Sequence, residues 1–379
     1  MGTLKDQVVI AGVGQTEYSK NSGVSTLSLA TQCAREAIAD AGMTPQDIDG
    51  MILFYLQEPL SCHEIAANLG IPQLNWSLNI AGGGNNGPAI VTAAAAAIAT
   101  GLAKNVICLH AINRRSSGRR PGGGGGGGGG GRWNGQTAAP QGFALWARRH
   151  MHEFGTKQEH LGQIAVSVRK HASLNPLAIM RQPITLEDYH SSRWITSPFH
   201  VFDCCLESDG GAALVLTGAD RARDLPKPPV YIMAGVANCW GPVANDAPDG
   251  PSYASLATYT AKNLWERAGV GPKDMSFAQL YDCFTYTLLT QLEDYGFCAK
   301  GEGGPFVEGG QRIELGGQLP VNTSGGQLSE AYVRSMSLFN EAVRQLRGEY
   351  AGTPRQVANA EMGLVTGAPN PTSAVVLRR

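Results

Sequence analysis

The chain has 379 residues, 43% of them hydrophobic and 16% charged, and is long enough to bury one large core or two medium ones. Its 30 basic and 31 acidic side chains give a net charge of −1, which excludes a global attraction to nucleic acid or to an anionic membrane surface. The eight cysteines form no CxxC pair and no zinc-binding spacing, so we expect reduced thiols and no metal site.

The N-terminal residues lead directly into an apolar, strand-like run over 8–13, without the features of a signal peptide. The triplet Gly12-Val13-Gly14 after it lacks the third glycine and the ribose-binding acidic residue of a dinucleotide site, so we predict no nucleotide cofactor. The most apolar long stretch, 89–103, is too short to span a bilayer. We therefore expect a cytoplasmic protein without a membrane segment.

An internal repeat organises the chain. Residues 28–47 and 255–274 are identical at nine of twenty aligned positions, and each copy predicts a helix that ends in an Ala-Gly pair. Apolar strand-like runs precede the copies at 8–13 and 230–236 and follow them at 51–55 and 277–281.

The parallel continues after the repeat. A glycine run at 82–84 opens an alanine-rich helix to about Thr100, and a strand over 105–110 follows. Gly325-Gly326 is expected to open a corresponding helix to about Leu346. Strands at 210–216 and 373–377 then close the two halves, which we place at 1–225 and 226–379. Duplicated βαβα halves predict an α/β fold with two sheets rich in parallel pairings and helices between and outside them.

Residues 114–198 have no counterpart in the second half. They begin with a cluster of four arginines and a run of ten glycines, and continue with helical patterns. We interpret them as an inserted cap over the active site. The arginines are Arg114, Arg115, Arg119 and Arg120, the glycines are 122–131, and the helical patterns cover 143–154 and 158–173.

The duplicated βαβα pattern with a cap in its first half resembles the thiolase superfamily, over nearly the whole chain. The phrases HMHEFGTKQEHLGQIAV (150–166), KHASLNP (170–176) and DGGAA (209–213) resemble its sterol-carrier-protein branch. Others resemble the thiolase-like lipid-transfer-protein aldolases of bacterial steroid side-chain degradation: SRWI (192–195), DCC (203–205), YDCFT (281–285), QLEDYGFC (291–298), GGQLSEAY (325–332) and VRQLRG (343–348).

The resemblance implies a five-layered α-β-α-β-α fold, but the thiolase nucleophile is missing. Gly84 stands at the position of the thiolase cysteine, and Thr366 stands at that of the second cysteine. Tyr332 replaces the catalytic histidine, and Tyr281 stands first in the phrase that carries an asparagine or histidine in relatives. A Claisen reaction needs a thiolate to form an acyl-enzyme, and glycine cannot provide one.

Two phenols suit proton transfer, provided that neighbouring donors lower the pKa of one from about 10. The resemblance therefore implies retro-aldol cleavage of a β-hydroxyacyl-CoA, a 17-hydroxy steroid-20-carboxyl-CoA that yields a 17-ketosteroid and propionyl-CoA. Tyr281 and Tyr332 are the expected acid and base, in an order left open, and the N–H groups of Gly84 and Ala368 map to the oxyanion hole. Coenzyme A enters as part of the substrate and not as a cofactor.

Less specific features admit more than one interpretation. Arg114, Arg115 and His152 are candidates for contacts with coenzyme A. The two arginines equally suit a solvated or partner-facing loop, and His152 equally suits an ordinary residue of the cap. A buried tyrosine is often a core phenol, and glycine at 84 also suits a tight turn. Thr366, Asp282 and Cys283 are expected to be structural.

Two other functions stay open, namely an acyltransferase that uses a displaced cysteine such as Cys283 and a non-catalytic subunit that binds acyl-CoA or lipid. The resemblance implies a homodimer and a small OB-fold acyl-CoA-binding partner. A ten-glycine run cannot close an apolar pocket by itself, which favours such a partner, although a plain solvent-exposed spacer explains it equally well.

Overall fold

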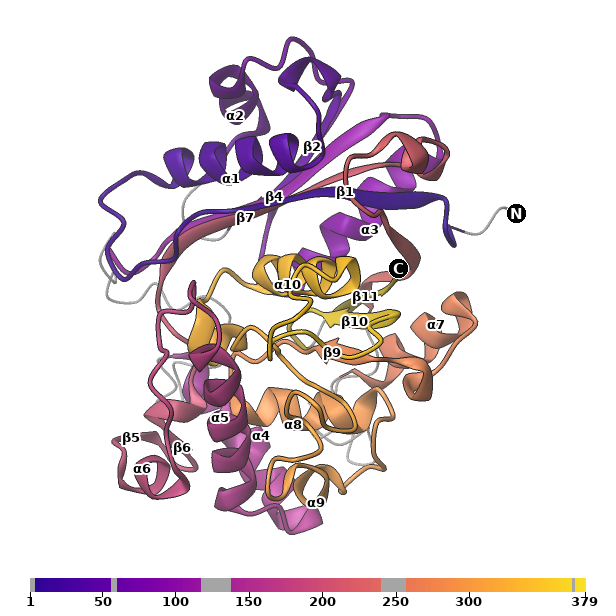
Figure 1. The fold of residues 1–379 in the computed structure, drawn as a ribbon. Helices are drawn as coiled ribbons and strands as arrows, with labels where there is room; N and C mark the ends of the chain where they lie inside the picture. Colours follow the sequence, from indigo (N-terminus) through magenta and orange to yellow (C-terminus); the bar gives the residue numbers. More distant parts are fainter. Residues whose placement is uncertain (1–3, 56–59, 117–137, 240–256, 370–371) are drawn as a thin grey trace.

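The computed structural model describes residues 4–55, 60–116, 138–239, 257–369 and 372–379. The expected duplication is present as two sets of alternating strands and helices (Figure 1). The first half contains β1 (Val8–Gln15), α1 (Thr26–Asp40), β2 (Gly50–Tyr55), α2 (Cys62–Leu69), β3 (Trp76–Ala81), α3 (Asn86–Ala99), β4 (Asn105–Asn113) and β7 (Asp209–Gly218). The second contains β8 (Val230–Cys239), α7 (Thr258–Ala268), β9 (Phe277–Gln279), α8 (Thr285–Asp294), α9 (Gly303–Val307), α10 (Ser335–Arg347), β10 (Met362–Thr366) and β11 (Thr372–Arg378).

The strand order repeats between the halves. The first half is ordered β3-β2-β4-β7-β1 and the second half β9-β10-β11-β8, with matching strand directions. Only β3 lacks a strand counterpart among the described residues, where a single bridge between Ala278 and Val321 replaces it. In Figure 1, α1 and α2 cover the outer face of the first-half strands, α3 and α10 lie between the halves, and α7 and α8 cover the second-half strands. These are the expected five layers.

Two details of the predicted sheets were wrong. The strands form one nine-stranded sheet, because β1 and β8 pair in the middle through Val9 opposite Tyr231 and Ile10 opposite Val230. Antiparallel pairings outnumber parallel ones, since each half closes on a strand that runs against its neighbours. Hydrophobic patterns predict where the strands lie but not in which direction they run. The internal repeat does not predict strand direction either.

The repeated segments fold alike because the same residues have the same conformational task. The glycine after each repeat helix, Gly42 and Gly269, has φ of +68°, which lets the chain leave the helix through a left-handed residue. Gly12 and Gly14 serve packing rather than nucleotide binding. A Cβ on either would lie 2.1 Å from a backbone oxygen of α1, so glycine is needed for the close approach of α1 to β1.

The helix expected from Gly325 to about Leu346 is interrupted. A π-helical turn spans Gly326–Glu330, the next four residues leave the helix, and α10 begins only at Ser335. The carbonyls of Ser329 and Glu330 accept hydrogen bonds of 3.0 Å from backbone N–H groups of the inserted region, which compete with helical bonding. The local sequence gives no sign of this tertiary contact, so the break could not be predicted from it. Tyr332 lies in the break.

The inserted region contains α4 (Ala139–Phe154), α5 (Gln158–Ser173), α6 (Leu186–Ser191), β5 (Trp194–Thr196) and β6 (Phe199–His200). Its apolar residues share one core cluster with those of the second half, and Figure 1 places α4 and α5 beside α8 and α9. The predicted glycine run 122–131 and Arg119 and Arg120 lie outside the described residues. No helix in the described part of the chain is long and apolar enough to cross a membrane.

Candidate active site

The two predicted tyrosines lie together, although 51 residues separate them. Their hydroxyl oxygens are 3.1 Å apart, and both side chains are buried, with exposed fractions of 2% for Tyr281 and 9% for Tyr332. Tyr281 follows β9, and Tyr332 comes from the break before α10. The fold thus brings two hydroxyl groups into one buried hydrogen-bonded pair.

Backbone contacts hold each tyrosine in place. The N–H of Tyr281 donates to Thr366 Oγ1 at 2.8 Å, and Thr366 in turn donates to Gln291 Oε1 at 2.5 Å. The Gln291 amide closes this ring by donating to the carbonyl of Tyr281 at 2.8 Å. The N–H of Tyr332 donates to Ser208 Oγ at 2.8 Å, at the start of β7. Thr366 therefore has the expected structural role, which is to fix Tyr281.

Gly84 packs directly against this pair. A Cβ at Gly84 would lie 1.9 Å from the hydroxyl oxygen of Tyr281 and 2.2 Å from its Cζ. No side chain can occupy position 84 while Tyr281 keeps its place, because real atoms do not approach so closely. The Tyr281 hydroxyl therefore occupies the space that a side chain at position 84 would need.

The predicted oxyanion-hole residues lie on adjacent segments. A Cβ at Gly367, next to Ala368, would be 2.9 Å from Asn85 Cα, so the two turns are in close backbone contact. Within the described residues, the N–H groups of Gly84 and Ala368 donate to no backbone carbonyl. Both α3 and α10 begin nearby, and Ser335 Oγ donates to the carbonyl of Gly84 at 2.8 Å. Helix N-termini and free N–H groups can stabilise a developing negative charge.

Burial raises the pKa of both phenols, whereas the sequence argument required one to be lowered. The pKa of Tyr281 is raised well above its ordinary value, by burial first and then by Tyr332. The pKa of Tyr332 is also raised by burial, but the guanidinium of Arg334 and the Tyr281 hydroxyl both oppose this effect. Arg334 also lowers the pKa of Tyr281, and its guanidinium carbon lies 5.6 Å from the centre of the Tyr332 ring.

Thiols near the site are not activated. Burial raises the pKa of Cys283 well above its ordinary value and that of Cys205 to about 12. A thiol with a raised pKa has almost no thiolate near neutral pH, and the thiolate is the nucleophile. These raised pKa values oppose a nucleophilic role for either thiol, and the burial of Cys283 fits its expected structural role.

Asp282 closes the site on the side of the π-helical turn. Its carboxylate accepts hydrogen bonds from the N–H of Gln327 at 2.9 and 3.1 Å. Burial raises the pKa of Asp282 to about 6, although these hydrogen bonds oppose the rise. The residue is an acceptor that holds the turn before Tyr332, which matches its expected role at the end of a strand.

The candidates for coenzyme A contacts differ in their distance from the tyrosines along the network of contacts. Arg114 and Arg115 both form ion pairs with Glu207, at 3.9 and 3.8 Å, one residue from Ser208. His152 is exposed near the C-terminal end of α4. The arginines thus border the site and His152 does not, and their roles towards coenzyme A stay predictions.

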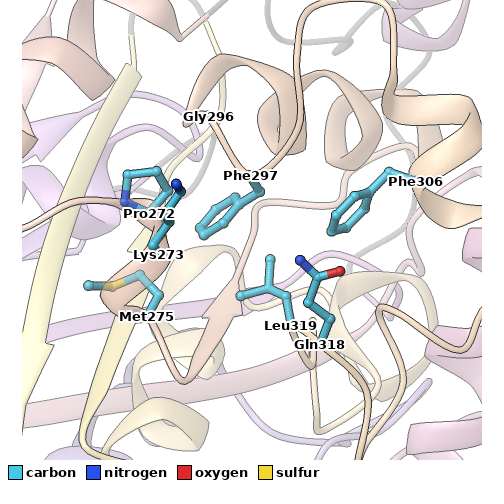
Figure 2. Close-up of a pocket in the computed structure, with 8 residues that line it drawn as sticks. All are labelled: Pro272, Lys273, Met275, Gly296, Phe297, Phe306, Gln318 and Leu319. Carbon is cyan, nitrogen blue, oxygen red and sulfur yellow. The ribbon is translucent and has the colours of Figure 1, made fainter.

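A separate pocket of about 360 Å³ lies in the second half, near the turn after α7 (Figure 2). Met275, Phe297 and Leu319 give it an apolar wall, and Lys273 and Gln318 lie at its edge. No predicted site residue lines this pocket.

Sequence reasoning missed Ser208, Gln291 and Arg334. Ser208 accepts from the N–H of Tyr332 across 124 residues of sequence, so no local pattern reveals it. Gln291 is ten residues from Tyr281, but the sequence pattern does not show that its amide contacts the Tyr281 carbonyl. Arg334 is two residues from Tyr332, but a charged residue is normally expected at the surface. Its exposed fraction is only 2%.

Comparison with known proteins places the chain. The family described as thiolase C-terminal domain-like matches residues 248–377. A steroid side-chain-cleaving aldolase of Thermomonospora curvata is 42% identical, covering 100% of this chain and 99% of the relative. A 17-hydroxy-3-oxo-4-pregnene-20-carboxyl-CoA lyase of Mycobacterium tuberculosis is 40% identical, covering 99% and 100%. An acetyl-CoA acetyltransferase of Methanothermobacter thermautotrophicus is 32% identical, covering 97% and 98%.

Among solved structures, an Ltp2-ChsH2(DUF35) aldolase matches with a TM-score of 0.90 and 40% identity, covering 100% of this chain and 99% of that one. Human mitochondrial 3-ketoacyl-CoA thiolase has a TM-score of 0.73 at 14% identity, with the same coverage, and shares the fold. The chain therefore belongs to the thiolase superfamily and, within it, to the family of thiolase-like steroid side-chain-cleaving aldolases.

Proposed function

We propose that this chain is a carbon–carbon lyase that cleaves a β-hydroxyacyl-CoA by a retro-aldol reaction. The substrate is a 17-hydroxy steroid-20-carboxyl-CoA, and the products are a 17-ketosteroid and propionyl-CoA. The observation that carries the proposal is the buried tyrosine pair, whose Tyr281 hydroxyl excludes any nucleophilic side chain from position 84. The names of the two relatives that are 42% and 40% identical, a steroid side-chain-cleaving aldolase and a steroid carboxyl-CoA lyase, support the substrate class.

The reaction needs one proton removed and one delivered. A base takes the proton of the 17-hydroxyl group, the oxygen electrons form the ketone, and the bond between C17 and C20 breaks. The bonding pair moves into the thioester and gives an enolate, whose oxygen the N–H groups of Gly84 and Ala368 can stabilise. Protonation of C20 then gives propionyl-CoA. No covalent acyl-enzyme forms, so no thiol is needed.

We assign the base to Tyr332 and the acid to Tyr281. The guanidinium of Arg334 lies 5.6 Å from the centre of the Tyr332 ring, and this charge and the Tyr281 hydroxyl both favour the Tyr332 phenolate. Tyr281 lies against Gly84, beside the N–H groups proposed to hold the enolate. After Tyr281 protonates C20, the proton held by Tyr332 can return to Tyr281 across their 3.1 Å contact. This transfer restores the starting state.

The acyltransferase alternative has one supporting observation, the 32% identity to an acetyl-CoA acetyltransferase. The raised pKa values of Cys283 and Cys205 oppose it, because neither thiol is poised as a nucleophile. A binding subunit without activity would not need two buried hydroxyl groups in contact. Removing each phenol from water costs free energy, and in such a subunit no catalytic role would offset that cost.

The proposal includes a homodimer and a small OB-fold acyl-CoA-binding partner. Strand β3 lies at the edge of the sheet and Leu78 on it is 43% exposed, as suits a strand that pairs with a second copy. The Ltp2-ChsH2(DUF35) aldolase carries two components in its name, which supports a partner for this chain too.

The test is an assay for ketone release from a 17-hydroxy steroid-20-carboxyl-CoA without free coenzyme A. It uses the full chain alone and co-expressed with an OB-fold partner. We expect equimolar ketone and propionyl-CoA, with higher activity in the complex. Cleavage that requires free coenzyme A would indicate thiolysis, and tight binding without turnover in both preparations would indicate a binding subunit.

A further inference from the structure

Arg334 stands out among the residues around the tyrosine pair. It is the last residue before α10, and its backbone has φ of +55° and ψ of −155°, a conformation that residues other than glycine rarely adopt. Such a conformation is unfavourable and persists only where the surrounding structure enforces it. Here it accompanies a guanidinium that is 2% exposed.

Comparison with the other buried arginines shows what is unusual. Among the described residues, Arg169, Arg347 and Arg355 are also buried, and each guanidinium donates hydrogen bonds. Arg355, for example, binds Glu341 Oε2 at 2.8 Å. Arg334 forms no ion pair or hydrogen bond through its guanidinium within the described part of the chain, and its Nε is buried without a partner. A buried cation without a partner is costly, and a negative charge that arises only during function would offset this cost.

The guanidinium of Arg334 faces the reacting groups. Its Cζ lies 5.6 Å from the centre of the Tyr332 ring, and its Nη1 lies 3.9 Å from the position of a Cβ on Gly83. It therefore lies between the proposed base and the loop that carries the proposed enolate donors.

The other titratable groups around Arg334 leave it as the main charge. His110 packs under Phe54, and burial followed by Arg334 lowers the pKa of His110 to about 3, so its ring is neutral. Burial raises the pKa of Cys205 to about 12 and that of Cys283 well above its ordinary value, so both are neutral thiols. Two other charged side chains nearby already have partners. Arg114 forms an ion pair with Glu207, and Asp282 accepts a hydrogen bond from the N–H of Gln327.

We propose that Arg334 is a positioning residue whose buried, unpaired guanidinium stabilises the phenolate of Tyr332 and so makes it a base. The inference rests on the proposed function and deepens it. The described residues provide no carboxylate partner for Arg334, and the phenolate of Tyr332 serves as its counter-ion while the base is ionised. A positive charge over the ring face attracts the phenolate charge, which is shared between the oxygen and the ring.

The test compares Arg334→Met with Arg334→Lys, which keeps the charge, and with Arg355→Met as a control for loss of a buried arginine elsewhere. In Arg334→Met, the acid limb of the kcat/KM profile should move up by about one pH unit or more. Activity near neutral pH should fall at least about tenfold and recover as the pH rises, because each unit corresponds to a tenfold change. Arg334→Lys should stay near the wild-type profile, and Arg355→Met should keep its acid limb.

A second readout does not depend on activity. Ultraviolet titration of tyrosinate should show one phenol that ionises at higher pH in Arg334→Met than in the wild type, and this phenol should be absent from Tyr332→Phe. The Met variant should also melt at a higher temperature than wild type, because it removes an unpaired buried charge, whereas Arg355→Met should melt lower.

Three results would overturn the proposal: a loss of activity that is equal at all pH values, an unchanged profile, or an unshifted tyrosinate titration. A pH-independent loss would mean that the guanidinium contacts substrate or only supports the fold. If the wild type cleaves no steroid thioester but the titration still shifts in Arg334→Met, the proposed function fails while the pairing of Arg334 with Tyr332 stands.

Discussion

The central helices of the two halves, α3 and α10, begin in different ways. In the first half, α3 follows the glycine run 82–84 almost directly and presents backbone N–H groups at the site. In the second half, the π-helical turn and the break separate Gly325 from α10, and the break presents the side chains of Tyr332 and Arg334. In the proposed site, the first half thus contributes the backbone donor at Gly84, and the second half contributes the backbone donor at Ala368 together with the ionisable side chains.

This difference explains how the fold can support new chemistry. The order of the strands repeats between the halves, apart from β3. The proposed site residues Gly84 and Tyr332 lie in the segments that precede the two central helices, α3 and α10. Function on a common fold resides in such sites and not in the architecture.

The largest expected effect is that of Tyr332→Phe. The substitution keeps the ring and removes only the hydroxyl group that we propose as the base. We expect kcat to fall by roughly 10²-fold or more with folding intact. Turnover kinetics and circular dichroism check this together, and a variant with wild-type turnover would remove Tyr332 from the mechanism. Tyr281→Phe should also lose activity and change the pH–rate profile.

Gly84→Ala should disturb the first-half side of the site. The added Cβ collides with the Tyr281 hydroxyl, so the phenol must move away from Tyr332. We expect a loss of about 1–3 kcal/mol in the free energy of unfolding and a marked loss of kcat. The control is Gly142→Ala, because a Cβ there meets nothing within 4 Å. If Gly84→Ala is as harmless as the control, the close packing of Gly84 on Tyr281 is wrong.

Thr366→Val should have a smaller effect, because Thr366 acts only through Tyr281. The substitution removes the acceptor of the Tyr281 N–H and the donor to Gln291. We expect a loss of about 1–3 kcal/mol of stability from the unpaired buried groups and a moderate fall in kcat. Denaturant unfolding and steady-state kinetics measure both, and Thr366→Ser should restore them.

Glu330→Gln tests how the stability of the π-helical turn in the second half depends on pH. Burial raises the pKa of Glu330 to about 8, from an ordinary value near 4.5, so the folded state retains this proton where the unfolded state has lost it. This contribution to stability is full below about pH 4.5 and is lost as the pH rises towards 8. The melting temperature of Glu330→Gln, relative to wild type, should therefore increase between pH 5 and pH 8. A constant difference would contradict the raised pKa.

The smallest expected effect is that of Cys283→Ala, which should leave turnover nearly unchanged. Mild alkylation of the wild type should also leave cleavage measurable, since burial raises the pKa values of Cys283 and Cys205. Complete inactivation that substrate prevents would revive the acyltransferase alternative.

Much of the architecture could be predicted from the sequence, because the repeat and the apolar runs record which segments are strands and helices. The predicted helix over 158–173 matches α5 at both ends. The break before α10 could not be predicted, since hydrogen bonds from the inserted region, far away in the chain, hold Ser329 and Glu330 out of a regular helix. Local propensity carries no record of such contacts.

The site was predictable only in part for a similar reason. Resemblance pointed to Tyr281 and Tyr332 because they replace known catalytic groups in recognisable phrases. The contact between them, the clash that requires glycine at position 84 and the burial of Arg334 depend on which segments meet in space. The raised pKa values of both phenols likewise follow from burial, which residue spacing does not reveal.

The most direct test of the central claim is hydrogen exchange at the α-carbon of propionyl-CoA in deuterated water. The claim is that two phenols, Tyr281 and Tyr332, move protons while the N–H groups of Gly84 and Ala368 hold the enolate, without a thiol. The account predicts that the wild type, with or without prior alkylation, incorporates deuterium at this carbon, as mass spectrometry would detect. Tyr281→Phe and Tyr332→Phe should exchange far more slowly. Exchange that survives in both tyrosine variants but disappears on alkylation would contradict the account.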